Sequence, residues 1–288
     1  MKTIDTLIRD IYGVIEGKGG WDNTITEYLS HSISSLAEER FSKEQKPRDY
    51  LSLSSVGTPC KRKIWYRINQ PESGEPIPPK ALGNFFYGDL LEALVLALAK
   101  AAGHKVEGEQ EQLEINGVFG HRDAIIDGVT VDVKSASNFG FSKFQNHKLR
   151  EDDPFGYISQ LSSYVYAGKD DPRVKDKKHG AFLAIKKEKF DLCLDTYDFS
   201  EEIKAKEEEI ESAKTLVQGG IPEERLAPVP QKPDPNNRQH QNKKLCIACS
   251  LCEYRKVCWP EARTFLYGDG PVHLVHVEHE PRVTELIE

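Results

Sequence analysis

The sequence predicts an α/β protein in which helices cover a mixed central sheet. Three features lead to this class: a long apolar helical stretch before Gly103, alternating strands around Asp127-Gly128, and a later helix followed by a hairpin. The chain has 288 residues, of which 38% are hydrophobic and 30% are charged. This composition is that of an ordinary globular protein, and the length allows one large domain or two modest ones.

The N-terminal part is expected to be mainly helical up to about residue 47, because apolar residues in NTITEYLSHSISSLAEERF recur at helical spacing. A basic, aromatic segment, SVGTPCKRKIWYRINQ, then introduces Cys60, and a proline-rich loop covers residues 71–79. A strong helix is expected from about residue 82 or 84 to Ala102, with Gly103 in the usual C′ position.

Strands are expected at about 104–116, 118–126 and 129–136. An Asp-Gly pair between alternating runs favours a two-residue hairpin turn, since both central positions adopt positive φ. With the turn at residues 127 and 128, the numbers of paired residues sum to 255. One face of this hairpin is then apolar and belongs to the core; it carries Ala124, Ile126, Val129 and Val131.

The opposite face would carry two aspartates directly across from each other, Asp123 and Asp132. Like charges about 5 Å apart repel by roughly 3 kcal/mol at an effective dielectric near 20. Side-chain alternation adds Lys134 and His121, again opposite one another. The face is therefore either a solvated surface on which Lys134 and His121 soften the repulsion, or a site that binds a cation.

The second half of the chain follows the same alternation of helices and strands. A helix is expected from Pro154 to Ala167, with Asp153 as N-cap and Gly168 at its end. A hairpin in HGAFLAIKKEKFDLCLDTYDF precedes a charged helix at 200–218. Residues 221–244 are rich in Pro, Asn and Gln, which indicates a linker.

Two helices carry further polar candidates. Glu92 lies among leucines, so it belongs either to an exposed stripe or to a paired or metal-bound site. Mg²⁺ and Mn²⁺ take carboxylate, water and phosphate oxygens. Gln160 and Tyr164 share a helix face with Tyr157. A stripe of this kind ordinarily belongs to the core. Gln160 within the stripe needs hydrogen-bond partners, and it could hold a phosphate or a metal-bound water.

These residues, in this order, resemble the PD-(D/E)XK nuclease superfamily in its RecB-like exonuclease branch. The matching positions are Glu92, Asp123, Asp132, Val133, Lys134, Gln160 and Tyr164, within residues 82–167. Arg122 precedes Asp123 where the superfamily often has proline, and GDLLE places Glu92 where RecB-like members often have histidine. The resemblance implies a restriction-endonuclease-like core. It further implies that the acids and the Val133 carbonyl hold Mg²⁺ or Mn²⁺, and that Lys134 positions or activates the attacking water.

The six cysteines are better explained as metal ligands or core residues than as disulfides, because no signal peptide is seen and a reduced cytoplasmic location is expected. CIACSLCEYRKVC holds four of them within a short segment, a spacing that suits zinc. Together with the Cys60 segment it resembles the iron–sulfur members of the superfamily, the CRISPR adaptation exonuclease and AddB-type nuclease domains. That resemblance implies a 4Fe–4S cluster on Cys60, Cys249, Cys252 and Cys258.

Three alternatives around the cysteines stay open: zinc in place of the cluster, free thiols, and Cys246 in place of Cys60 as fourth ligand. Cys193 is expected in the core. A clip that joins residue 60 to the segment ending at 258 closes a loop of about 190 residues. In the chain-entropy model this stabilises the fold by several kcal/mol. A structural role for the cluster is therefore expected.

The expected domain organisation has three parts: a helical region 1–80 that contributes one cluster cysteine, a nuclease core 81–220, and a linker with the cluster segment at 221–288.

No membrane association is expected, because the longest apolar run, Ala93–Ala99, is too short to span a bilayer. The net charge of −7 restricts DNA binding to local basic tracts and bound cations. Such tracts occur at Lys61, Arg62, Lys63 and Arg67, at Lys143, Lys148 and Arg150, and at Lys243 and Lys244, with nearby aromatic residues Trp65, Tyr66, Phe139 and Phe141.

The function expected from these features is that of a divalent-metal-dependent DNA exonuclease, a hydrolase acting on single-stranded or duplex DNA ends in recombination, repair or phage DNA metabolism. A helicase or recombination protein is a conceivable partner. Two alternatives remain: a non-catalytic DNA-binding or scaffolding protein with the same iron–sulfur fold, and an endonuclease.

Overall fold

The computed structural model describes residues 2–42, 49–231 and 241–287, which form two compact units. The first unit contains the described residues up to 42, Leu51–Gly57 and Pro78–Lys214. The second contains Thr58–Ile77 and the described residues from Thr215 onward, together with residues 49 and 50. Each unit is thus assembled from segments that are distant in the sequence.

The first unit is built on a five-stranded sheet. Its strands in spatial order are β1 (Val106–Glu107), β4 (Ala124–Ile126), β5 (Val129–Ala136), β6 (His179–Lys186) and β7 (Leu192–Asp198). Strands β5 and β6 are parallel, and the other neighbouring pairs are antiparallel. The sheet is therefore mixed, and the predicted α/β class and the predicted β6–β7 hairpin are confirmed.

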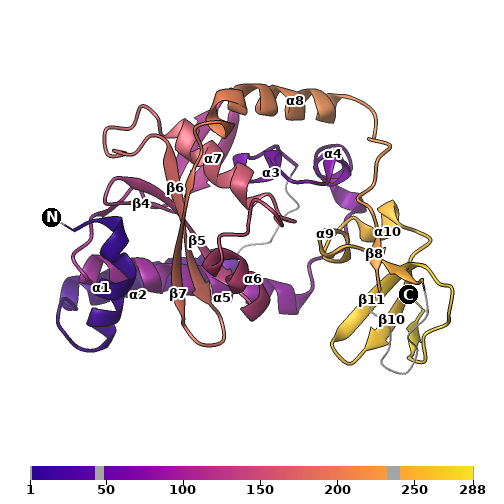
Figure 1. Ribbon diagram of the computed structural model, residues 1–288, viewed down its shortest axis with the longest axis horizontal. Coiled ribbons are helices and arrows are strands. Elements are labelled where there is room, and N and C mark those ends of the chain that lie inside the picture. Colours follow the sequence, from indigo (N-terminus) through magenta and orange to yellow (C-terminus); the bar gives the residue numbers. More distant parts are fainter. Residues whose placement is uncertain (1, 43–48, 232–240, 288) are drawn as a thin grey trace. The chain divides into compact units, whose positions relative to one another are not determined.

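Helices cover both faces of this sheet. On one face α1 (Leu7–Ile15) and α5 (Pro79–Ala101) pack on the apolar side of β4 and β5. On the other face α6 (Asn138–Gln145) and α7 (Tyr157–Ala167) pack on β6 and β7. Figure 1 shows the sheet between α1 and α6.

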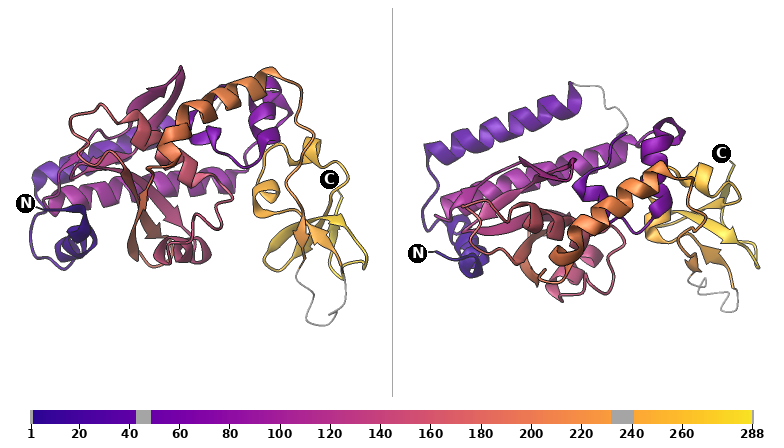
Figure 2. Two further views of the ribbon diagram at one scale, coloured as in Figure 1. Left: turned by 45° about the horizontal axis from the view of Figure 1, so that its top comes forward. Right: turned by 90° about the horizontal axis from the view of Figure 1, so that it is seen from above.

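The shorter and outer helices complete the first unit. Helix α2 (Asn23–Phe41) lies along α5, as both views in Figure 2 show, and buries none of its own residues. A turn of 3-10 helix, η1 (Ile4–Thr6), precedes α1, and α3 (Leu53–Val56) packs against α7. The predicted charged helix consists of η3 (Glu202–Ala205) and α8 (Lys206–Gln218).

The hairpin between β4 and β5 has the predicted register. Ile126 lies opposite Val129, and Ala124 lies opposite Val131. The turn residues have positive φ, 53° at Asp127 and 90° at Gly128. Its predicted apolar face is confirmed as core, with Ala124, Ile126 and Val131 fully buried and Val129 packed against the same cluster.

The expected strand 118–126 is interrupted at Asp123. Its first half, β3 (Val118–Arg122), pairs with β2 (Glu111–Ile115) in a separate two-stranded sheet. His121 therefore lies opposite Gln112, and its expected pairing with Lys134 is wrong. The reason is local, because positive φ at residues 116 and 117 closes a turn that lets residues 111–122 pair with each other.

Helix α5 begins one turn earlier than predicted and ends where predicted, with Ala102 as C-cap and Gly103 at a φ of 81°. Among the described helices it is the one that is long and apolar enough to cross a membrane by length and composition. The run Ala93–Ala99 alone does not reach that length. All seven residues of this run except Leu94 are buried, and Leu94 packs on the core of the first unit.

Helix α7 ends at Gly168 as predicted but begins at Tyr157, with Gly156 as N-cap at a φ of 81°. The predicted start at Pro154, with Asp153 as the cap, is wrong. The Asp153 carboxylate instead accepts hydrogen bonds from the backbone N–H groups of Gly156 (2.9 Å) and Ile158 (2.8 Å). It closes the turn in front of the helix, and glycine supplies the left-handed conformation at the entry.

The second unit combines short helices with a small sheet. Its helices are α4 (Lys61–Asn69), η2 (Pro71–Ser73), α9 (Ile247–Ser250) and α10 (Arg255–Cys258). Its strands in spatial order are β12 (Glu285–Leu286), β10 (Arg263–Tyr267), β11 (Gly270–His276), β9 (Lys243–Lys244) and β8 (Val229–Pro230). The segment expected to be a linker thus contributes β8 and β9, while its residues 232–240 lie outside the described residues.

Candidate active site and cysteine pocket

Strand β5 presents Asp132 and Lys134 on the sheet face that α6 and α7 cover. The two residues are two positions apart, so their side chains point the same way. Asp132 is fully buried and forms an ion pair with Lys134, whose side chain is 18% exposed. One oxygen of Asp132, Oδ1, has no hydrogen-bond partner among the described residues.

Asp123 lies in the gap between β3 and β4, beyond the last residue pair of the hairpin. Its Oδ2 accepts a hydrogen bond of 2.7 Å from the backbone N–H of Val133, which holds the carboxylate beside β5. Burial raises the pKa of Asp123 well above its usual value, and the charges of Asp132 and Glu92 raise it further. Burial likewise raises the pKa of Asp132, although Lys134 opposes this.

Glu92 reaches this acidic pair from α5. Its side chain is half-buried, and its Oε1 accepts a hydrogen bond of 2.6 Å from Gln110 Nε2. Burial raises the pKa of Glu92 to about 7; the charge of Asp132 adds to the rise, while Gln110 and Lys134 oppose it. Glu92 is therefore part of the same electrostatic group and does not belong to a solvated stripe.

Gln110 links two of these carboxylate residues, and sequence reasoning did not identify it. Its backbone N–H donates to the carbonyl of Asp123 (3.3 Å), while its side chain donates to Glu92. The backbone φ of Gln110 is 51°, a left-handed conformation that is uncommon for glutamine. The polar run 107–112 carries no motif that would have indicated this bridge.

Lys134 stays protonated in this surrounding. Burial alone would lower the pKa of Lys134, but the charges of Asp132 and Asp123 outweigh burial and raise it. The Lys134 ammonium also lies 5.1 Å from the centre of the Tyr157 ring. The site thus holds a fixed positive charge next to its three carboxyl groups.

Tyr164 and Gln160 border the acidic pair from α7. The Gln160 amide donates a 3.1 Å hydrogen bond to the hydroxyl of Tyr164, which is 2% exposed. Burial raises the pKa of Tyr164, and the charge of Asp132 raises it further, so the phenol keeps its proton. Both side chains can therefore act as neutral hydrogen-bond donors at the edge of the site.

The donor set fits a hard divalent cation in chemical type. Mg²⁺ and Mn²⁺ prefer carboxylate oxygens, and the buried, unpartnered oxygen of Asp132 is an acceptor that a cation would satisfy. In the described part of the chain, no three His, Cys, Asp or Glu side chains lie close enough together to hold an ion as they stand. Closing such a site therefore requires some movement of these side chains.

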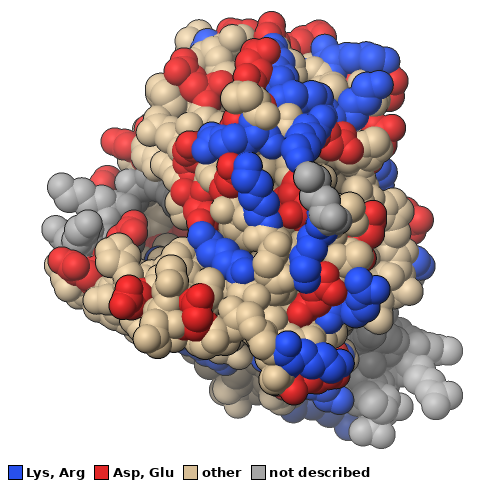
Figure 3. Space-filling model, turned by 90° about the vertical axis from the view of Figure 1, so that its left-hand side faces the viewer, with Lys and Arg blue, Asp and Glu red and all other residues tan. Residues whose placement is uncertain are grey.

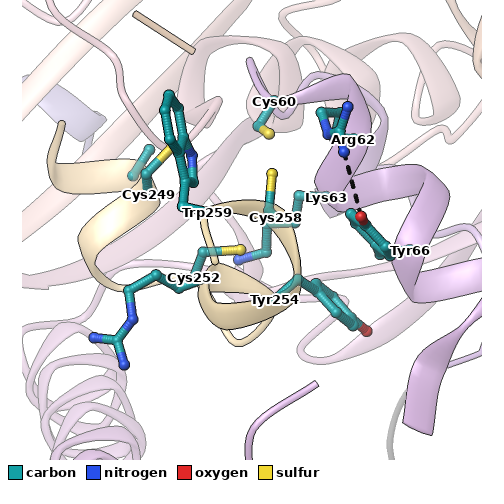
Figure 4. Close-up of a pocket in the computed structure, with 11 residues that line it drawn as sticks. Cys60, Arg62, Lys63, Tyr66, Cys249, Cys252, Tyr254, Cys258 and Trp259 are labelled. Atoms are coloured by element: carbon teal, nitrogen blue, oxygen red, sulfur yellow. Dashed lines mark hydrogen bonds between the residues drawn. The ribbon is translucent and has the colours of Figure 1, made fainter. Parts of the chain in front are cut away.

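Four cysteines line one pocket in the second unit. Figure 4 shows Cys60, at the start of α4, together with Cys249, Cys252 and Cys258. The sulfur atoms of Cys60 and Cys258 point toward one another. Cys246 does not line this pocket, although its thiol contacts that of Cys249.

Contacts outside the thiols hold α4 against this segment. Glu253 forms ion pairs with Lys63 (3.1 Å) and with Arg67 (3.0 Å). The rings of Tyr66 and Tyr254 stack with their centres 5.4 Å apart. The pocket is thus framed by packing and charge between segments about 190 residues apart.

The electrostatics of the pocket favour an occupant that accepts hydrogen bonds. Burial raises the pKa of Cys60 and raises that of Cys252 to about 12, so these two thiols are neutral without a ligand. Arg62 Nε and Trp259 Nε1 are buried lining donors without a hydrogen-bond partner in the described structure. A sulfide-rich anionic cluster supplies such acceptors, and the residues present fit it in this respect.

Comparisons with known proteins add little to this geometry. No family model matches the sequence, and no curated protein matches it. Among solved structures, the chain is similar to one described as "Crystal structure of SSO0001", with 16% sequence identity and a TM-score of 0.38. The similarity covers 66% of this chain and 85% of the other.

Proposed function

We propose that this chain is a divalent-metal-dependent deoxyribonuclease whose first unit has a restriction-endonuclease-like core of the PD-(D/E)XK type. One observation carries the proposal. Asp132, fully buried and with one oxygen unpartnered, lies beside Asp123 and forms an ion pair with Lys134 on the same strand. Strongly perturbed acids grouped around a buried lysine are typical of a catalytic site rather than of a structural ion pair.

In this proposal Glu92, Asp123, Asp132 and the carbonyl of Val133 would hold Mg²⁺ or Mn²⁺. Such an ion polarises a phosphoryl group and lowers the pKa of a water molecule. Burial raises the pKa values of the three acids, and at Glu92 and Asp123 neighbouring carboxylates raise them further. A cation would stabilise the charged forms that burial disfavours, so these pKa values fit an ion-binding role.

The remaining polar groups of the site would act on the phosphate and the water. Lys134 keeps its charge, so it can orient the attacking water and counter the negative charge that develops on the phosphate. Gln160 and Tyr164 keep their protons and can donate hydrogen bonds to phosphate oxygens. These four functions, ion binding, water orientation, charge stabilisation and phosphate binding, together describe phosphodiester hydrolysis.

We further propose that Cys60, Cys249, Cys252 and Cys258 hold a 4Fe–4S cluster with a structural role in the second unit. The buried N–H donors of Arg62 and Trp259 suit an anionic group with sulfur ligands, which a 4Fe–4S cluster supplies. Protein purified without oxygen should be brown and should contain about four irons per chain with matching sulfide. A colourless protein containing one equivalent of zinc would reject the cluster.

The substrate in this proposal is DNA with an accessible end, in recombination, repair or phage DNA metabolism, and the location is cytoplasmic. Figure 3 shows one face on which Lys and Arg side chains gather in a band, with Asp and Glu side chains among and beside them. Several cations of the basic tracts are already paired, as Lys143 is with Asp152 (2.7 Å). Binding would therefore depend on a few local contacts and on bound ions.

A non-catalytic DNA-binding protein with the same fold is the second candidate. It is favoured by the absence, in the described residues, of three ligands already close enough to hold an ion. Lys134 argues for catalysis, since binding alone would not require a buried lysine among three acids.

Cleavage assays separate these candidates. Purified chain with Mg²⁺ or Mn²⁺ should degrade end-labelled linear DNA, and Lys134→Met and Asp132→Asn should each lower the rate by about 10² to 10⁴-fold. Lys189→Met removes an exposed lysine in the β6–β7 turn and should leave the rate unchanged. An unchanged cleavage rate in Lys134→Met would reject the assignment. Cleavage of closed circular DNA would identify an endonuclease.

A further inference from the structure

Two exposed phenylalanines lie beside α6 and the start of α7. Phe139, at the start of α6, is 73% exposed, and Phe155, just before α7, is 41% exposed. Lys143 connects the two positions, because its Nζ atom lies 5.2 Å from the centre of the Phe139 ring and 2.7 Å from a carboxylate oxygen of Asp152. Single exposed apolar side chains are common on protein surfaces, so the surroundings of Phe155 decide whether it has a role.

The turn in front of α7 holds the backbone of Phe155 in one position. Pro154 fixes the backbone on one side of it. Asp153 Oδ1 accepts hydrogen bonds from the backbone N–H groups of Phe155 (3.3 Å) and Gly156 (2.9 Å). Gly156, with a φ of 81°, then directs the chain into the helix. Phe155 is thus presented on a well-ordered turn, and little of this backbone has to be ordered when a ligand binds.

A row of partly exposed side chains leads from Phe155 to the proposed active site. The rings of Phe155 and Tyr157 have their centres 5.6 Å apart, and the Tyr157 ring centre lies 5.1 Å from Lys134 Nζ. Tyr157 is half-buried and Lys134 is partly exposed, so the row follows the surface of the unit. Its inner end is the ion pair of Lys134 with Asp132. A ligand that lies along this row contacts Phe155 at one end and Lys134 at the other.

The length of this row matches the spacing of groups along a nucleic-acid strand. Successive phosphates of one strand lie about 3.4 Å apart along the axis of a duplex. With the phosphate to be hydrolysed at Lys134, a base within about three nucleotides of it therefore reaches the Phe155 ring. A single strand can thus occupy the proposed active site and contact Phe155 at the same time.

The groups around Phe155 favour an uncharged ring over a phosphate as its ligand. Asp152 and Asp153 precede it in the sequence, and carboxylates repel an anion. Asp152 is paired with Lys143, so the charge of this lysine is already balanced. The face of a phenyl ring stacks on a nucleobase of any sequence. The bases of a duplex are already paired and stacked on one another, whereas an unpaired base has a free face for Phe155.

We propose that Phe155 stacks on an unpaired base of the DNA strand that occupies the active site, so that the substrate is single-stranded DNA. This inference rests on the proposed function for the position of the phosphate at Lys134. It adds the class of substrate, because stacking on Phe155 selects a strand whose bases are not engaged in a duplex. The contact contributes to affinity without reading the sequence of the strand.

The test compares binding of two labelled strands of equal length and charge by fluorescence anisotropy. One strand is oligothymidine, and the other is the same deoxyribose-phosphate chain with an abasic residue at every position. A chelator keeps the DNA intact, because the proposed chemistry needs a divalent ion. We expect Phe155→Ala to lower the affinity for oligothymidine about tenfold and to leave the affinity for the abasic strand unchanged. The salt dependence of oligothymidine binding should also stay unchanged, since no phosphate contact is lost.

Two further variants make the result decisive. Phe155→Tyr keeps an aromatic face and should bind oligothymidine within about twofold of the parent. Phe119→Ala removes a phenylalanine of similar exposure, 42%, from β3 and should bind both strands as the parent does.

Three results would each overturn the inference: an equal loss with both strands, no loss with oligothymidine, or no binding of oligothymidine by the parent. Cleavage by the parent chain with Mg²⁺ or Mn²⁺ tests the proposed function separately. Base-dependent binding through Phe155 without any cleavage would keep the stacking contact and assign it to a non-catalytic DNA-binding protein.

Discussion

Burial of Asp132 leaves one carboxylate oxygen without a hydrogen-bond partner in the described structure, and its charge is balanced mainly by Lys134. A buried ion pair contributes little net stability when both partners are present, but removing one partner leaves an uncompensated charge. The buried ion pair of Asp132 and Lys134 therefore adds little to the free energy of unfolding, although it lies where the proposed chemistry needs a fixed positive charge.

This pair can be tested without any assumption about activity. Lys134→Met should lower the free energy of unfolding by about 3 to 5 kcal/mol near pH 7, because Asp132 is then buried alone. The double variant Lys134→Met with Asp132→Asn should recover most of that loss. Urea denaturation of the single and double variants measures this coupling, and additive losses would contradict it.

The pKa of Glu92 gives a second prediction, on the ion-free chain. Its pKa in the folded state is raised from 4.5 to about 7, so between these values the folded chain keeps a proton that the unfolded chain releases. Stability contributed by the neutral carboxyl is therefore lost as the pH rises from about 4.5 to about 7. Glu92→Gln should flatten this dependence and should be more stable than the parent near pH 7.5.

The measurement is denaturation in the presence of a chelator at about pH 5 and about pH 7.5. Glu114→Gln offers a matched control, since Glu114 is an exposed strand residue of the β2–β3 sheet. A parent chain whose stability does not fall across this range, or a Glu92→Gln chain that still shows the full fall, would contradict the assignment.

At this scale the sequence indicated the acids and the lysine but not the residue that connects them. The register counted from the turn holds as far as Ala124 and Val131. Asp123 lies one residue beyond this ladder, and the backbone N–H of Val133 holds its carboxylate beside β5. Gln110 acts through a left-handed backbone in an irregular segment and through a contact with a helix 18 residues away. No residue pattern encodes that contact, because it depends on how α5 packs.

Among the elements, the β4–β5 hairpin depends most on its turn. Gly128 has a φ of 90°, and an added Cβ would lie 2.8 Å from the Lys175 side chain. Gly128→Ala should lower the free energy of unfolding by about 1 to 2 kcal/mol, because a side chain is strained in this conformation. Gly220→Ala, where φ is ordinary and nothing lies within 4 Å, should change it by less than about 0.5 kcal/mol.

Thermal denaturation of both glycine variants measures the difference. Equal stability of the two would show that the turn geometry does not control this hairpin, and the register that places Asp123 beside β5 would lose its physical basis.

The end of a helix could be predicted where a single glycine determines it. The limits of an element could not be predicted where two local interactions compete for the same residues. Gly103 and Gly168 stop α5 and α7 as expected. The start of α7 was misplaced because Asp153 can serve either as a cap or as a turn acceptor, and the structure uses the second. The strand 118–126 was misplaced because residues 111–115 offer β3 a partner across the short turn at residues 116 and 117.

On the scale of the whole molecule, the chain divides into two units with separate cores. The second unit is small, its described core is concentrated around Tyr66, Tyr254 and Trp259, and its helices α9 and α10 have four residues each. Small units with few buried residues usually need a covalent or metal clip. The four-cysteine pocket is the feature of this unit that could provide one.

The last prediction follows from this division. Cys252→Ser, in protein prepared without oxygen, should speed amide hydrogen exchange in α4, α9 and α10 by about tenfold or more, because the loss of one ligand weakens the clip. Strands β5 and β6 should exchange as before, since their core is separate. Cys193→Ser, at a cysteine of β7 that does not line the pocket, serves as the control and should leave exchange in the second unit unchanged. If Cys252→Ser also leaves α4 and α10 unchanged, the four thiols bind no common group, and the ion pairs of Glu253 with Lys63 and Arg67 must hold this unit together unaided.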